Sequence, residues 1–258
     1  MMPADLAFAL LINRTTAYYQ ANPPVYMTYT ERTHVTAVSL GRSQDINRTV
    51  AVRVADDFAV MKDLPNGGER TGQAFPIIAY FDPFSQFGFS WFANLKRVDI
   101  KLDRGQPYTL PTPEPDPSVN VVVPYFRFMV PRYAPDSTES AIHLLIDATP
   151  ALKGSSFFYR ELVEDSRTHL PSRIVLDSIG SDETIALDYA VIEGHWVITH
   201  AIWSATEHAL VFTSKVVADV TFSDIAFPNE PPDPRLAGSP LPPPASPAPS
   251  ASSQAPRP

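Results

Sequence analysis

The stretch LDYAVIEGHWVITHAIWSATEH, residues 187–208, decides the fold, because two alternating runs flank the dipeptide Glu193-Gly194. Successive side chains of a strand point to opposite faces, and a two-residue turn that contains glycine joins antiparallel strands into a hairpin. A slip of one residue would mix polar and apolar side chains on both faces. The favoured register therefore predicts one apolar face made of Leu187, Tyr189, Val191, Trp196, Ile198, His200 and Ile202.

The same stretch holds three of the six histidines, a residue type that binds metals and transfers protons near neutral pH. His195 and His200 are five residues apart on one strand, so the alternation places them on opposite faces. Residues 206–208 read as a turn, which would leave His208 in solvent. The three side chains are thus expected to lie apart, as ordinary strand histidines with neither a metal nor a catalytic role.

Short strands continue on both sides of this hairpin, separated by turn residues every 8–12 positions, the spacing of an antiparallel meander. A second hairpin is predicted for residues 49–55 and 58–64, with its turn at Asp56-Asp57. One helix is predicted for residues 4–20, and it ends before Asn22-Pro23-Pro24. The expected fold class is mainly β (α+β): a large antiparallel sheet of about eight or more strands preceded by one amphipathic helix.

One helix covers only part of so large a sheet, so the sheet either closes on itself or leaves an apolar concavity that can bind an apolar ligand. The helix and an aromatic segment, residues 79–95, are expected to roof it. A Pro-rich loop, residues 109–120, is a second irregular insertion of the kind that gates or lines a site. The expected ligand-binding wall is Leu10, Tyr189, Trp196, Ile198, Phe212 and Phe222, with Phe84, Phe87, Trp91 and Phe92 as lid or plug. The alternative is that these aromatic side chains fill the concavity as core.

Composition and motifs argue against other functions. The chain has no cysteine, so disulfides, thiolate metal sites and cysteine nucleophiles are excluded. A net charge of −8 without a basic run argues against a nucleic-acid partner. The G-x-S-x-G and H-E-x-x-H motifs are missing from the sequence. We predict a non-enzymatic protein without a cofactor, while an enzyme that uses dispersed acids or histidines stays open.

The C-terminal end is predicted to be disordered, and the apolar run near the N-terminus is not predicted to be a membrane span or a signal. Residues 1–228 form the predicted folded domain, and residues 229–258, rich in Pro, Ala and Ser, form a predicted disordered tail whose removal should not change thermal stability. Residues 6–12, LAFALLI, are too short to span a membrane and lack the features of a secretory signal. Either the protein stays inside the cell, or the given chain begins after its signal.

Several stretches together resemble the outer-membrane lipoprotein-sorting proteins, the LolA-like family, which is also related to a periplasmic regulator of envelope stress. The helix is followed by YMTYTERTHV (26–35), and FYRELVEDSRTHLPSRIVLDS (158–178) and VVADVTFSDIAFP (216–228) come later. The most telling positions are Asp165, Thr168, Leu170, Pro171 and residues 219–227. The chain departs from the family in its insertions at 75–95 and 109–120 and in its tail, and no position matches the family's lid-locking arginine.

The resemblance implies a half-closed antiparallel β-barrel, with the N-terminal helix as a lid over a hydrophobic cavity. It further implies a periplasmic or otherwise exported carrier or chaperone that transports a lipoprotein acyl chain or another lipid. The partners would be a lipid or lipidated protein, with an envelope protein held through the tail, and the chain would act as a monomer. The alternative is an envelope structural, interaction or sensor module with a side-chain-filled core and a Pro-rich tether.

Overall fold

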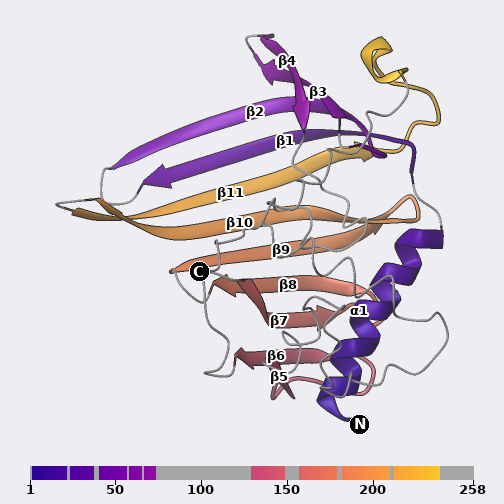
Figure 1. Ribbon diagram of the computed structural model, residues 1–258, viewed down its shortest axis with the longest axis vertical. Helices are drawn as coiled ribbons and strands as arrows, with labels where there is room; N and C mark the ends of the chain where they lie inside the picture. The colour runs from indigo at the N-terminus through magenta and orange to yellow at the C-terminus, as the bar shows by residue number, and fades with distance from the viewer. Residues whose placement is uncertain are drawn as a thin grey trace, which may run out of the picture.

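The computed structural model describes residues 2–21, 24–37, 41–56, 58–65, 67–73, 129–148, 157–178, 182–209 and 212–238. These ranges contain one α-helix, a short 3-10 helix and an antiparallel sheet of eleven strands (Figure 1). In chain order the elements are α1 (Ala4–Ala21), β1 (Tyr26–Ala37), β2 (Arg42–Arg53), β3 (Phe58–Leu64), β4 (Glu69–Gln73), β5 (Met129–Tyr133), β6 (His143–Ala148), β7 (Phe157–Glu164), β8 (Pro171–Ser178), β9 (Glu183–Ile192), β10 (His195–Ala209), β11 (Phe212–Ala226) and η3 (Pro234–Leu236).

The strands follow the order β4-β3-β2-β1-β11-β10-β9-β8-β7-β6-β5. Strands that lie side by side in the sheet also follow one another in the sequence, with one exception. At this seam β1, the first described strand, pairs antiparallel with β11, the last. Strands β4 and β5 form the two edges, so the sheet stays open (Figure 1). The prediction of a half-closed antiparallel meander is confirmed.

The hairpin predicted from residues 187–208 forms between β9 and β10. Glu193 and Gly194 both have positive φ angles, 50° and 82°, as a two-residue hairpin turn requires. The register places Tyr189 opposite Ile198, and both side chains are buried. We call this apolar side of the whole sheet the inner face and the opposite side the outer face.

The prediction that His200 and Ile202 lie on the apolar face is wrong. The β9–β10 register shifts between Ile198 and His200, so that Thr199 is an extra residue in β10. Such a bulge reverses the alternation beyond it. His200 consequently lies opposite Asp188 on the outer face, while Ala201 takes its place on the inner face, opposite Leu187. The bulge also removes the argument that put His195 and His200 on opposite faces.

The turn predicted at residues 206–208 is also wrong. Strand β10 continues to Ala209, and His208 lies opposite Thr213 in the ladder with β11. Pairing with β11 supplies backbone hydrogen bonds along the whole of this stretch, which overrides the local turn preference of the polar residues. Both strands are therefore long, with 15 residues each.

Helix α1 spans Ala4–Ala21, one residue longer than predicted, and has Asp5 in its first turn, where an acidic residue interacts favourably with the helix dipole. It crosses the β5–β9 part of the sheet near one end of these strands (Figure 1). Ala7, Phe8 and Leu11 are buried against the sheet. None of the described helices is long and apolar enough to cross a membrane.

The folded domain extends ten residues beyond the predicted end at residue 228. Leu236, in η3, is 0% exposed, and Asp233 caps η3 by accepting a hydrogen bond from the Arg235 backbone N–H. Arg53 on the outer face pairs with Asp56 and donates hydrogen bonds to the carbonyl oxygens of Leu236 and Gly238. The predicted insertions at 75–95 and 109–120, and the tail from residue 239, lie outside the described residues.

Two truncations test this boundary. Ending the chain after Gly238 should leave the free energy of unfolding unchanged, because every described contact of η3 is kept. Ending it after Pro228 should lower that free energy by at least about 2 kcal/mol, since it removes a buried leucine and the acceptors of Arg53. Urea unfolding followed by circular dichroism measures both. Equal stability of the two truncated chains would contradict the assigned boundary.

Candidate functional site

The inner face carries a continuous cluster of buried apolar side chains that runs from α1 across the seam. Near the helix, the rings of Tyr189 and Trp196 stack with centroids 4.1 Å apart. The Trp196 indole is 1% exposed, and its Nε1–H donates a 2.7 Å hydrogen bond to the Pro171 carbonyl oxygen. A buried indole needs such an acceptor. Beyond the seam, Phe222 on β11 makes an edge-to-face contact with Tyr29 on β1.

Helix α1 contributes an apolar stripe to the same cluster. Phe8 meets Tyr159 on β7 edge to face, with ring centroids 5.4 Å apart. Leu11 lies one turn further along the helix and is also buried. Thr15 is buried too, but its hydroxyl donates back to the Leu11 carbonyl oxygen, so no polar atom of that side chain is left unpaired against the sheet.

Two tyrosine hydroxyls fix the ends of the helix. Tyr133 on β5 donates a 2.8 Å hydrogen bond to the Met2 carbonyl oxygen, just before the helix begins. Burial, and then the charges of Asp5 and Glu164, raise the pKa of Tyr133, so the phenol remains a donor. At the other end, Tyr18 donates a 2.7 Å hydrogen bond to the Gly194 carbonyl oxygen in the β9–β10 turn.

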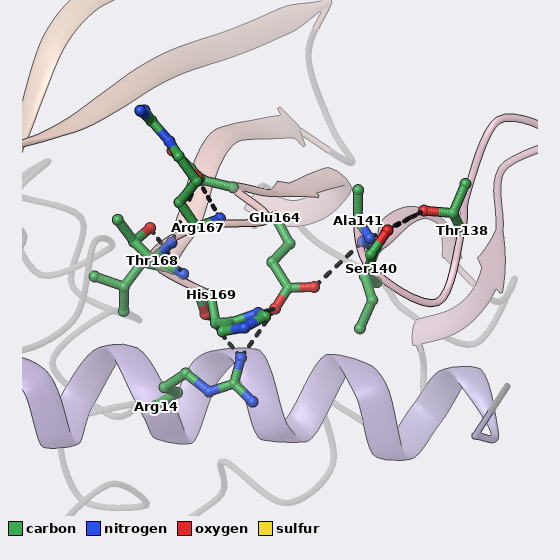
Figure 2. A network of polar contacts seen from close by, with 11 residues as sticks. Arg14, Thr138, Ser140, Ala141, Glu164, Arg167, Thr168 and His169 are labelled. Carbon is green, nitrogen blue, oxygen red and sulfur yellow. Dashed lines mark hydrogen bonds and ion pairs between the residues drawn. The ribbon is translucent and has the colours of Figure 1, made fainter.

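Between these ends, a buried carboxylate anchors the middle of the helix (Figure 2). The Glu164 side chain, at the end of β7, is 3% exposed. Its Oε1 accepts hydrogen bonds from Arg14 Nη1 at 2.9 Å and lies 3.0 Å from His169 Nδ1, and its Oε2 accepts from the Ile142 backbone N–H at 3.2 Å. A carboxylate this deeply buried would destabilise the fold without such partners.

The turn between β7 and β8 holds these partners in place. Asp165 Oδ1 accepts a 2.7 Å hydrogen bond from the Arg167 backbone N–H, which lowers the pKa of Asp165. His169 adopts a left-handed φ of 58°, and its carbonyl oxygen accepts a second hydrogen bond from Arg14 Nη1 at 2.9 Å. Arg14 therefore binds both the buried carboxylate and the adjacent turn (Figure 2).

Sequence reasoning missed this anchor, which we call the Glu164 anchor: Glu164, Arg14, His169 and the Ile142 N–H. Arg14 and Glu164 are 150 residues apart in the sequence, so no local pattern links them. The available signals were Glu164 at the end of the strand run 157–164 and Arg14 in the imperfect stripe of the helix. Such a glutamate is also common on an exposed strand end.

The inner face becomes charged further along β1 and β2. Glu31 is only 5% exposed in its side chain and makes a 2.6 Å ion pair with Arg48 Nη2. Glu31 lies opposite both Arg48 on β2 and Phe222 on β11, so the pair adjoins the apolar cluster on the same face. This ion pair is an addition to the apolar face expected from the sequence.

The predicted wall residues are placed as follows. Four of them lie buried on the inner face within the apolar cluster: Tyr189, Trp196, Ile198 and Phe222. Leu10 is half-buried on α1. Phe212 begins β11, but its side chain lies outside the described part of the chain, as do Phe84, Phe87, Trp91 and Phe92. A ligand-binding role for any of these residues stays a prediction.

The histidines do not converge on a metal site. His200 lies between Asp188 and Asp219 on the outer face, with ring nitrogens 3.0 Å and 2.9 Å from their carboxylate oxygens. His195 packs against the Phe227 ring at the other end of β10. Within the described residues, no group of three or more histidine, aspartate and glutamate side chains is arranged to hold a metal ion.

Comparison with solved structures finds several similar chains. The chain is similar to a putative outer membrane lipoprotein-sorting protein domain from Vibrio parahaemolyticus, at 9% identity and a TM-score of 0.39, over 86% of this chain and 93% of that one. It is also similar to a DUF1329 family protein from Desulfovibrio piger, at 10% identity and a TM-score of 0.37, over 88% and 94%. No family model and no protein of curated function matches the sequence.

The Glu164 anchor yields a test of how α1 is held. Arg14→Met should lower the free energy of unfolding by about 1–3 kcal/mol, because it removes a donor from a buried carboxylate while keeping the apolar stem of the side chain. Arg167→Met is the matched control: its side chain is 88% exposed, so a change within about 0.5 kcal/mol is expected. Urea unfolding measures both. Equal effects would show that Glu164 does not need Arg14.

Proposed function

We propose that the protein is a non-enzymatic carrier of the cell envelope, which binds a lipoprotein acyl chain or another lipid on the inner face, with α1 as a lid. The observation that carries this proposal is the width of the apolar cluster. The polar and ring contacts described for α1 involve β5, β7 and the β7–β8 and β9–β10 turns. The cluster continues across the seam to Tyr29, Val50 and Met61.

The way α1 is attached supports a lid. Apart from its apolar stripe, the helix is fixed by the two tyrosine hydroxyls and by the Glu164 anchor. The two tyrosine contacts are exposed, so water can replace them when the helix lifts. Glu164 keeps the Ile142 N–H and His169 as partners when Arg14 leaves with the helix. Burying an alkyl chain in exchange is favourable by about 0.8 kcal/mol per CH₂ group. The helix can therefore lift at moderate cost when a ligand enters.

One observation favours the second candidate, an interaction module whose inner face is filled by its own side chains. Trp196 and Tyr159 are each only 1% exposed beneath the helix, so this part of the face is already well packed. In that case the Pro-rich segment would tether a protein partner of the envelope. The two candidates differ in whether an acyl chain can reach Trp196.

Tryptophan quenching decides between them. The chain has three tryptophans, so the variant Trp91→Phe/Trp203→Phe leaves Trp196 as the sole emitter. A brominated fatty acid bound on the inner face should quench Trp196, and each added CH₂ should tighten binding about fourfold. The unbrominated acid is the control for indirect effects, and native mass spectrometry reports stoichiometry.

Arg14→Met in the same background should speed the onset of quenching, because it weakens the hold on the lid. A bound lipid mass without quenching would place the ligand elsewhere on the protein. Absence of both bound mass and quenching, across several chain lengths, would contradict the carrier and favour the filled core.

A further inference from the structure

The apolar rows of the inner face end in a row of three charged residues. Glu31 on β1, Arg48 on β2 and Asp63 on β3 lie directly opposite one another in the strand register. The preceding rows on the same face are apolar, formed by Tyr29, Val50 and Met61 and then by Met27, Val52 and Ala59. A ligand chain lying along these rows would meet the charged row at one end.

Internal contacts satisfy only part of this row. Arg48 Nη2 lies 2.6 Å and 2.7 Å from the two carboxylate oxygens of Glu31, and the Thr33 hydroxyl lies 3.0 Å from Glu31 Oε1. Among the residues that the structure describes, Arg48 Nε and Asp63 Oδ1 are buried without a hydrogen-bond partner. A buried donor and a buried acceptor that stay unpaired destabilise the fold, so both favour a further hydrogen-bond partner.

We propose that Glu31, Arg48 and Asp63 form the polar subsite of the acyl ligand, specific for an uncharged group that both accepts and donates hydrogen bonds, such as a hydroxyl or an amide. This inference rests on the proposed carrier function. Such a group can accept from Arg48 Nε–H and donate to Asp63 Oδ1. Two carboxylates against one guanidinium leave the row net negative, which disfavours a fatty-acid carboxylate or a phosphate.

The test compares a brominated monoacylglycerol with the brominated fatty acid of equal chain length, using Trp196 quenching. The monoacylglycerol should bind about tenfold more tightly, the effect of one good hydrogen bond to a charged group. Asp63→Asn should remove most of this preference, because it removes a negative charge and a strong acceptor. Asp45→Asn is the matched control on the same hairpin, since Asp45 is 71% exposed on the outer face.

The outcomes separate the two proposals. Binding of both lipids with equal affinity, or tighter binding of the fatty acid, overturns the subsite and leaves the carrier intact; the unpaired atoms then hold water. Binding of neither lipid overturns the carrier and the subsite together. A preference that Asp63→Asn and Asp45→Asn reduce equally also overturns the subsite, because the effect would then be one of overall charge.

A second feature, on the outer face, is independent of any ligand. Acidic and basic side chains alternate from strand to strand across eight strands of the sheet, on β6, β7, β8, β9, β10, β11, β1 and β2. Successive pairs within β6–β11 are 3.3, 4.0, 2.6, 3.0 and 2.9 Å apart, and the last pair, across β1 and β2, is 2.6 Å apart. In this order the row is His143, Glu161, Arg173, Asp188, His200, Asp219, His34 and Asp45.

We infer that this row contains a pH-dependent brace: protonation of His200, which lies between Asp188 on β9 and Asp219 on β11, stabilises the pairing of β9, β10 and β11 beside the β1–β11 seam. His34 lies directly opposite Asp219 at the seam itself. His200 is faced by Asp188 from β9 and Asp219 from β11, and Arg173 from β8 contacts Asp188.

The sign of the pH dependence follows from His200, and His195 on the same strand serves as the comparison. Burial tends to lower the pKa of His200, but hydrogen bonds and charges of Asp188 and Asp219 outweigh it and raise that pKa. Its stabilisation is thus complete below the unfolded-state pKa and is lost as the pH rises through the folded-state value. Burial lowers the pKa of His195, outweighing the charge of Glu193, so its contribution is lost as the pH falls.

Thermal unfolding from about pH 5.5 to about pH 8 tests the brace. The wild type should exceed His200→Gln in Tm most at the acidic end, and the difference should shrink toward pH 8. His195→Gln, the control on the same strand, should show the opposite trend. Nuclear magnetic resonance titration of the wild type should place the His200 pKa above that of His195. A pH-independent Tm difference, or the reverse order of the two pKa values, overturns the brace.

Discussion

The pairing of β1 with β11 is the interaction on which the rest of the structure depends. It joins the first strand of the chain to the last, so two meanders that lie far apart in sequence become one sheet. Without it, the rows on the inner face would stop at β11, and Phe222 would lose its contact with Tyr29. Contacts of this range close late in folding, because a long loop of chain must be ordered first.

The two faces of the sheet use charge in different ways. On the inner face, Glu164 is buried and needs Arg14, His169 and a backbone amide, so charge there fixes one geometry of the helix. On the outer face, half-exposed pairs such as His200–Asp188 contribute little individually, as surface ion pairs do. The raised pKa of His200 makes its own contribution depend on pH. Charge on the inner face therefore holds the helix in place, whereas for charge on the outer face we propose a pH-dependent role.

Features set by neighbouring residues were predictable from the sequence. The dipeptide Glu193-Gly194 predicted a hairpin turn, because glycine readily adopts positive φ angles. The limits of α1 were predicted by Pro3 and Asp5 at its start and by the prolines after residue 21. The bulge at Thr199 was not predictable, because nothing in the local alternation shows an extra residue. The segment 229–238 looked like a tail since its composition is poor in apolar residues, yet one leucine with a distant arginine orders it.

The candidate site, too, has a part that the local sequence predicts and a part that it does not. Alternation alone put Tyr189, Trp196, Ile198 and Phe222 on one apolar face, whereas the charged contacts Arg14–Glu164 and Arg48–Glu31 depend on how the elements assemble.

The hydrogen bonds from Arg53 to the carbonyl oxygens of Leu236 and Gly238 have a practical consequence. Gly238, the last described residue, lies on the outer face, whereas Met2 lies beside α1 on the inner face. A probe attached at Gly238 would therefore report on the outer face, and one attached at Met2 would report on the surroundings of the helix.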